Sequence, residues 1–159
     1  MKRRDVLALI ANAIALRPAM GVAQQSRIGI IDDGSIWDNF RAQLRSLGHI
    51  DGENLSFEYR VAEGNPERLI GAAKDLAGIP VDLIAVFGSP AARAAQAATD
   101  KVPVVAISIG DPVRIGLVKS LAHPGGNVTG NTILGPDLVP KRLQLLKEVL
   151  PLLTRISFL

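Results

Sequence analysis

Short apolar runs alternate with amphipathic segments along most of this chain. The runs are typical of β-strands, and they cover residues 27–31, 82–87 and 102–107. Two further strands are expected at residues 55–60 and at residues 127–133, which follow the Pro-Gly-Gly break. Four segments with apolar residues at helical spacing follow them, at residues 36–47, 66–76, 90–98 and 113–122. Strands that alternate with helices across short turns form a parallel sheet with right-handed crossovers. We therefore expect an α/β fold with a doubly wound parallel sheet.

The spacing also predicts which side chains are buried. Residues 55–60 alternate between apolar and polar, which is typical of an edge strand with one solvated face. The first two helices are expected to bury the apolar residues Ile36, Trp37, Phe40, Leu44, Leu47, Leu69, Ile70, Ala73 and Leu76. A strongly amphipathic helix follows the last strand, with Leu138, Val139, Leu143, Leu146, Val149 and Leu150 on its inner face. Residues 155–159 then resemble the start of another strand.

Three of the predicted strands lead directly into a short polar turn that opens a helix. The turns are 32–35, 88–90 and 110–112. In the last two, Ser89 and Asp111 stand directly before a proline, which predicts an N-cap followed by proline at the first helical position. Such turns lie at the carboxyl edge of a parallel sheet, where open α/β sheets bind small polar ligands. The pattern therefore predicts a binding scaffold.

The N-terminus has the three parts of a secretory signal peptide. Lys2, Arg3 and Arg4 are followed by the apolar run 6–16 and by the small residues 21–23. We expect residues 1–23 to direct export and cleavage to follow Ala23. The start of the segment also resembles a twin-arginine export motif. The alternative is an amphipathic first helix of the folded domain.

The excess of positive charge in the chain lies in the N-terminal segment. Four of the 18 basic residues and one of the 15 acidic ones precede Gln24, which leaves 14 of each sign in the rest of the chain. A neutral chain without a basic face does not favour a nucleic-acid partner. The absence of cysteine does not distinguish an exported protein from a cytosolic one.

The polar turns carry the candidate chemistry. Asp111 can cap a helix and also face a cationic group of a ligand. Ser89 can cap the next helix while the N–H groups of Ala91 and Ala92 bind a carboxylate. Asp32 and Asp33 are adjacent and have no visible acid–base partner, so we interpret them as solvated turn carboxylates.

Nothing in the sequence indicates catalysis. His49 and His123 fall in separate turns, without the cluster that a metal site needs, and phosphate-loop, dinucleotide and serine-nucleophile motifs are absent. We therefore expect no enzyme activity, no cofactor and no metal. Two alternatives remain. One is a single-lobe, flavodoxin-like signalling domain that would use Asp32 and Asp33, and the other is a small α/β hydrolase or isomerase.

From Gly52 onward the chain resembles the substrate-binding proteins of ABC transporters, in the branch related to tryptophan and tyrosine uptake. The most specific of the matching stretches is Pro-Gly-Gly-Asn-Val-Thr-Gly at 124–130. The others are 52–54, 58–64, 88–92, 110–113, 116–118 and 141–146. The resemblance implies a type I periplasmic-binding fold with a Rossmann-like lobe. It also implies a periplasmic receptor that closes two lobes on a small solute such as an amino acid. The receptor would deliver this solute to an ABC permease in the inner membrane.

The resemblance further implies domain boundaries and site residues. It covers the first half of a usual family member, so residues 24–133 would form the N-terminal lobe. Residues 134–159 would be a crossover helix and the first strand of a second lobe that is missing, which makes this a truncated form. The ligand-facing positions implied by similarity are Ser35, Gly88, Ser89, Pro90, Ala91, Asp111 and Thr129.

Overall fold

One five-stranded, all-parallel sheet organises the molecule. The computed structural model describes residues 25–32, 34–133 and 135–156, so the predicted signal segment and Asp33 lie outside the described residues. The strands are β1 (Ser26–Ile31), β2 (Leu55–Arg60), β3 (Leu83–Phe87), β4 (Val104–Gly110) and β5 (Val128–Ile133). Their order is β2-β1-β3-β4-β5, with parallel pairing throughout. The chain adds β2 on one side of β1 and the later strands on the other, which confirms the doubly wound α/β fold and the edge position of β2.

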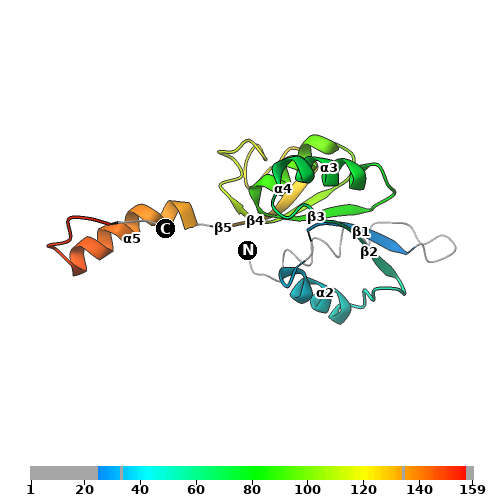
Figure 1. Cartoon of the computed structure of the whole chain (residues 1–159), viewed down its shortest axis with the longest axis horizontal. Helices are drawn as coiled ribbons and strands as arrows, with labels where there is room; N and C mark the ends of the chain where they lie inside the picture. The colour runs from blue at the N-terminus through cyan, green and yellow to red at the C-terminus, as the bar shows by residue number, and fades with distance from the viewer. Residues whose placement is uncertain (1–24, 33, 134, 157–159) are drawn as a thin grey trace.

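Helices cover both faces of the sheet. Helix α2 (Ile36–Ser46) lies on one face, and helices α3 (Pro66–Ala77) and α4 (Gly88–Ala98) lie together on the other (Figure 1). The pleat of β1 divides its side chains between these layers: Ile28 and Ile30 join the α2 cluster, whereas Ile31 joins the α3–α4 cluster. Strands that are covered on both faces need apolar residues at successive positions, which is the pattern of the sequence.

The predicted buried faces are largely confirmed at the centre of each helix. Trp37, Phe40 and Leu44 of α2 are buried, as are Leu69, Ala73 and Leu76 of α3. Ile36, Leu47 and Ile70 were expected to be buried as well, but about half of each side chain is exposed. Ile36 and Leu47 lie at the two ends of α2, and Ile70 lies on the outer side of α3, where the sheet does not reach.

Helix α4 begins earlier than the sequence predicted. It starts at Gly88 with Phe87 at the N-cap position, and no side chain caps it. Ser89 is therefore not the N-cap, and Pro90 is the third helical residue rather than the first. Gly88 makes this early start possible, because its φ of +81° lets the chain turn sharply out of β3.

The helix expected at 113–122 is absent. Residues 112–120 form turns and bends on the same side of the sheet as α4. Gly116 has a φ of +72°, which interrupts any right-handed helix at the middle of the segment. Asp111 consequently caps a single turn, in which the N–H of Arg114 donates to Asp111 Oδ1 at 3.0 Å.

Helix α5 (Gly135–Val149) extends away from the sheet and its helices (Figure 1). Its predicted inner face is therefore not covered by the described part of the chain. Leu143 is half-buried, whereas Leu138, Val139, Leu146, Val149 and Leu150 are exposed. Arg155 and Ile156 are not in a strand, and residues 157–159 lie outside the described residues. None of the described helices is long and apolar enough to span a membrane.

Candidate functional site at the carboxyl edge of the sheet

The carboxyl ends of β1 and β3 flank the point at which the sheet reverses its winding. These two strands are neighbours, and the chain leaves β1 toward α2 on one face but leaves β3 toward α4 on the other. Divergent connections leave a crevice between them, which is where open α/β sheets bind ligands. The turns 32–35 and 88–90 therefore border the candidate site.

The start of α4 offers hydrogen-bond donors on one side of this crevice. The first N–H groups of a helix have no intrahelical acceptor. Because α4 begins at Gly88, these groups belong to Gly88 and Ser89, and Pro90 has none. Ala91 is the first residue whose N–H can reach a carbonyl of its own helix, and its side chain is buried in the α3–α4 cluster. The donors for an anion thus lie earlier in the chain than expected.

Ser89 also ties the start of α4 to the end of β4. Its Oγ accepts a hydrogen bond from the N–H of Gly110 at 3.3 Å. On the other side of the crevice, Ser35 occupies the N-cap position of α2, but its side chain makes no capping hydrogen bond. Ser35 is exposed, and no hydrogen bond to α2 fixes the orientation of its hydroxyl.

Asp32 has a structural contact that the sequence did not indicate. Its φ is +61°, and its Oδ1 accepts hydrogen bonds from the N–H groups of Ala62 and Glu63, the latter at 2.8 Å. The half-buried carboxylate thereby holds the segment between β2 and α3 against the end of β1. The interpretation of Asp32 as a solvated turn carboxylate is wrong, because two backbone donors occupy one of its oxygens.

Asp111 lies after the end of β4 with a φ of +36°. Besides accepting from the backbone of Arg114, its carboxylate pairs with the Arg114 guanidinium, with Oδ2 3.2 Å from Nε. An arginine of its own turn therefore already neutralises the charge that was expected to face a ligand cation.

Three residues that sequence reasoning missed shape the end of β4. The pairing of β4 with β5 is irregular between Ala106 and Ile109, and Ser108 in this bulge has a φ of +60°. The N–H of Ser108 donates to Asn131 Oδ1 at 2.7 Å, which replaces the ladder bond that the bulge removes. A Cβ on Gly130 would lie 1.8 Å from the carbonyl oxygen of Ala106, so only glycine fits there. The Thr-Gly-Asn string was the one available signal of this arrangement.

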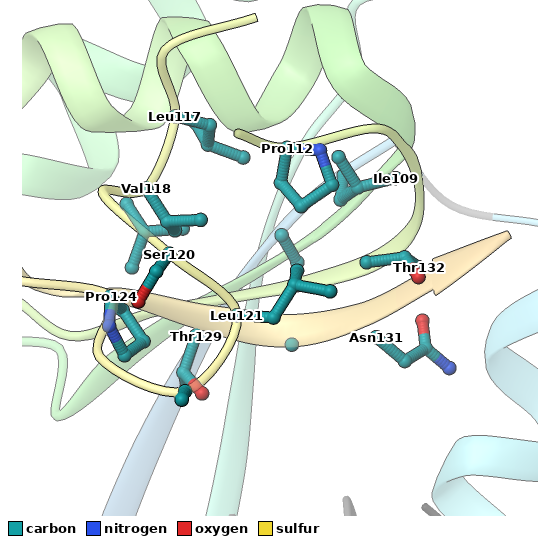
Figure 2. A pocket seen from close by; sticks show the side chains of 14 residues that line it. Ile109, Pro112, Leu117, Val118, Ser120, Leu121, Pro124, Thr129, Asn131 and Thr132 are labelled. Carbon is teal, nitrogen blue, oxygen red and sulfur yellow. The ribbon is translucent and has the colours of Figure 1, made fainter. Parts of the chain in front are cut away.

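The structure does not bring Thr129 to the same edge. Thr129 pairs with Val105, whereas the carboxyl ends of these strands are at Gly110 and Ile133. Four residues of strand correspond to about 13 Å. Thr129 instead lines a cavity of about 230 Å³ between β5 and the loop that follows β4 (Figure 2). Ser35, Gly88, Ser89, Pro90 and Asp111 remain as the edge cluster.

The described residues contain no group of three or more metal-ligating side chains. The chemistry that the edge offers is therefore hydrogen bonding: outward N–H groups at the start of α4, and serine hydroxyls on both sides of the crevice.

Comparison with known proteins identifies the family. A profile of the family described as ABC transporter substrate binding protein matches residues 34–159. The chain belongs to this family. A curated relative is the tyrosine-binding protein of Clostridioides difficile strain R20291, which is 35% identical to this chain over 113 residues. That match covers 70% of this chain and 32% of the relative.

Solved structures of similar proteins agree with the family and the fold. An ABC domain from Streptococcus pneumoniae in complex with L-Trp has a TM-score of 0.64 at 30% identity and covers 69% of this chain. A conserved domain protein from Vibrio cholerae has a TM-score of 0.68 at 34% identity and covers 82%. A substrate-binding protein with adhesive properties from Clostridium difficile, in its ligand-free, open form, has a TM-score of 0.65 at 33% identity and covers 77%.

The chain spans less than half the length of these family members. It covers 32% of the tyrosine-binding protein and 39%, 45% and 43% of the three solved chains. The described fold thus corresponds to one part of a longer architecture. Family membership favours a solute-binding lobe over the flavodoxin-like signalling domain and the small hydrolase or isomerase.

Proposed function

We propose that residues 24–133 form one lobe of a solute receptor that captures an amino acid for an ABC transporter. Relatives whose names mention tyrosine or L-Trp support an aromatic amino acid as the ligand. In this proposal a second lobe closes over the first, because a two-lobed clamp buries a small ligand and expels its water. Residues 134–159 would then lead toward that lobe, and the receptor would pass its solute to a permease in the membrane without enzymatic chemistry.

The observation that carries this proposal is the uncapped start of α4. The start of α4 borders the point at which the sheet reverses its winding, and no side chain caps it. A helix N-terminus carries a partial positive charge and outward donors, so it favours a carboxylate. The Ser35 hydroxyl on the opposite side of the crevice can hydrogen-bond to the same ligand.

Amide NMR of the chain during titration with L-tryptophan tests the proposal. We expect shifts to concentrate at Gly88 and Ser89, and we expect tryptamine, which lacks the carboxylate, to leave these amides unchanged. Ser89→Asp should abolish the shifts by placing a negative charge where the carboxylate binds. Ala97→Asp puts the same charge at the far end of α4 and serves as the matched control. Equal responses to tryptophan and tryptamine would contradict carboxylate binding at α4.

We also propose that the receptor is exported to the periplasm through residues 1–23. The arrangement of the basic, apolar and small residues supports this. Intact-mass analysis of protein recovered from a bacterial periplasm should give a chain that begins at Gln24. Recovery of only the uncleaved chain, in the cytosol, would count against export.

A further inference from the structure

The cavity beside β5 extends along the strand to its carboxyl end, and most of the side chains that line it are apolar. On one side it is formed by β5 and the end of β4, and on the other by the loop 112–124 (Figure 2). Ile109, Leu117 and Val128 are buried in its walls, and Pro112 and Val118 complete the apolar lining. Its volume is about 230 Å³, which exceeds that of an apolar cavity able to hold benzene, about 150 Å³.

The cavity exists because the loop over β5 is irregular. A helix would present regularly spaced side chains to the strand, whereas the turns around Gly116 leave part of the space above β5 unfilled. The cavity also reaches down to the strands, because the lining residues Ala106 and Gly130 have almost no side-chain volume to fill it. Leu121 lies in the middle of the lining side chains in Figure 2. Because 68% of Leu121 is exposed, its apolar side chain lies at the open side of the cavity.

The polar groups around the cavity are poor partners for water. Ser120 Oγ already accepts from the N–H of His123 at 2.9 Å, and Asn131 Oδ1 accepts from the N–H of Ser108. None of the residues that line the cavity is charged. The hydroxyl of Thr132 remains as an adaptable hydrogen-bonding group. With no charged side chain in the lining and apolar residues over most of it, these walls suit a neutral, mostly apolar occupant.

We infer that the cavity between β5 and residues 112–124 is a second binding site, for a neutral molecule with one aromatic ring and at most one hydroxyl group. The ring fills the space bounded by Ile109, Leu117 and Leu121. The hydroxyl bonds to Thr132 of β5. A charged ligand is excluded, because no lining side chain would pair with its charge. The inference does not depend on the proposed amino-acid site.

Methyl NMR of the full chain with benzyl alcohol as the probe tests this site. We expect saturable shifts at the methyl groups of Ile109, Leu117 and Leu121, with those of Ile28, under α2, unchanged. Benzoate has the same ring but a negative charge, and should bind at least tenfold more weakly. Absence of saturable shifts, shifts spread over the whole molecule, or equal binding of benzoate would each overturn the inference. This readout needs no variant and is therefore independent of folding defects.

A pair of neighbouring substitutions provides a second test. Thr132→Phe puts a ring at the lining position on β5 and should weaken benzyl alcohol binding at least tenfold while raising the melting temperature. Ile133→Phe adds a ring at the next position, which does not line the cavity, and should leave binding unchanged. Equal affinities for both variants would show that benzyl alcohol binds elsewhere and would refute the site.

Discussion

Asp32 shows how a single side chain supports the edge of the sheet from which the ligand would be bound. Its Oδ1 receives the N–H groups of Ala62 and Glu63, so the carboxylate connects β1 to the segment after β2. Removing the acceptor leaves two donors unpaired in a half-buried setting. The same contact gives the acid at this position a structural role.

Two substitutions of Asp32 distinguish the contribution of its hydrogen bonds to stability from the contribution of its charge. Asp32→Ala should lower the free energy of unfolding by about 1–3 kcal/mol, because both donors lose their acceptor. Asp32→Asn keeps an oxygen acceptor and tolerates a positive φ, so it should cost clearly less. Urea denaturation of both variants measures the difference. Equal losses would mean that the negative charge, rather than the acceptor, stabilises the edge.

Gly130 is the second residue whose identity the structure explains. A methyl group there would collide with the Ala106 carbonyl, and the backbone has a φ of +155°. We expect Gly130→Ala to cost about 3 kcal/mol or more, or to prevent folding, because β5 must move away from β4. Gly126→Ala is the control, since a Cβ at Gly126 meets nothing within 4 Å. A melting temperature for Gly130→Ala equal to that of Gly126→Ala would refute the close approach of the two strands.

At the scale of elements, α5 differs from the other helices because its apolar side is uncovered by the described part of the chain. On one side Gln144 accepts from Lys141 at 3.3 Å and donates to Glu148 at 2.9 Å, which marks a polar stripe. Away from this stripe lie exposed apolar residues that include Leu146 and Leu150. An exposed apolar stripe favours association with another surface.

We therefore expect the 159-residue chain to self-associate through α5. Leu146→Glu should shift the chain toward monomer in light scattering and leave its melting temperature within about 2 °C of the parent, since an exposed substitution changes stability little. Gln144→Glu adds the same charge on the polar stripe and should not change the association. A parent chain that is monomeric at high concentration would contradict this prediction.

At the scale of the whole molecule, the described fold would provide one wall of the proposed binding site. A ligand carboxylate at α4 would remain open to water on its other side, where opposite charges 4 Å apart gain only about 1 kcal/mol. This gain is smaller than the cost of immobilising a ligand. Tight binding therefore requires a second wall.

The 159-residue chain should accordingly bind aromatic amino acids no more tightly than about 1 mM, which corresponds to about 4 kcal/mol. Titration calorimetry or the amide shifts described above give the value. Micromolar binding by the monomeric chain would show that one lobe is sufficient, and would contradict the two-lobed clamp.

The sequence by itself determined the strands, their parallel arrangement and the turns that border the candidate site. Apolar runs identified β1, β3 and β4, because a strand buried on both faces must be apolar along its length, and alternation identified the edge strand β2. The cap of α3 is a local feature: Asn65 precedes Pro66, and its side chain accepts from the N–H groups of Glu67 and Arg68. The resemblance carried by residues 124–130 pointed to the family that the comparison confirms.

Only the tertiary structure decided where these parts lie relative to one another. Helical periodicity at 113–122 could not reveal that Gly116 adopts a positive φ, because that choice depends on how the loop crosses β5. The bulge at Ser108, the place of Thr129 away from the edge, and the partners of Asp32 all arise from pairing between residues distant in the chain. A local pattern records which face of an element is apolar, but register and contact between elements are set by the packing of the whole sheet.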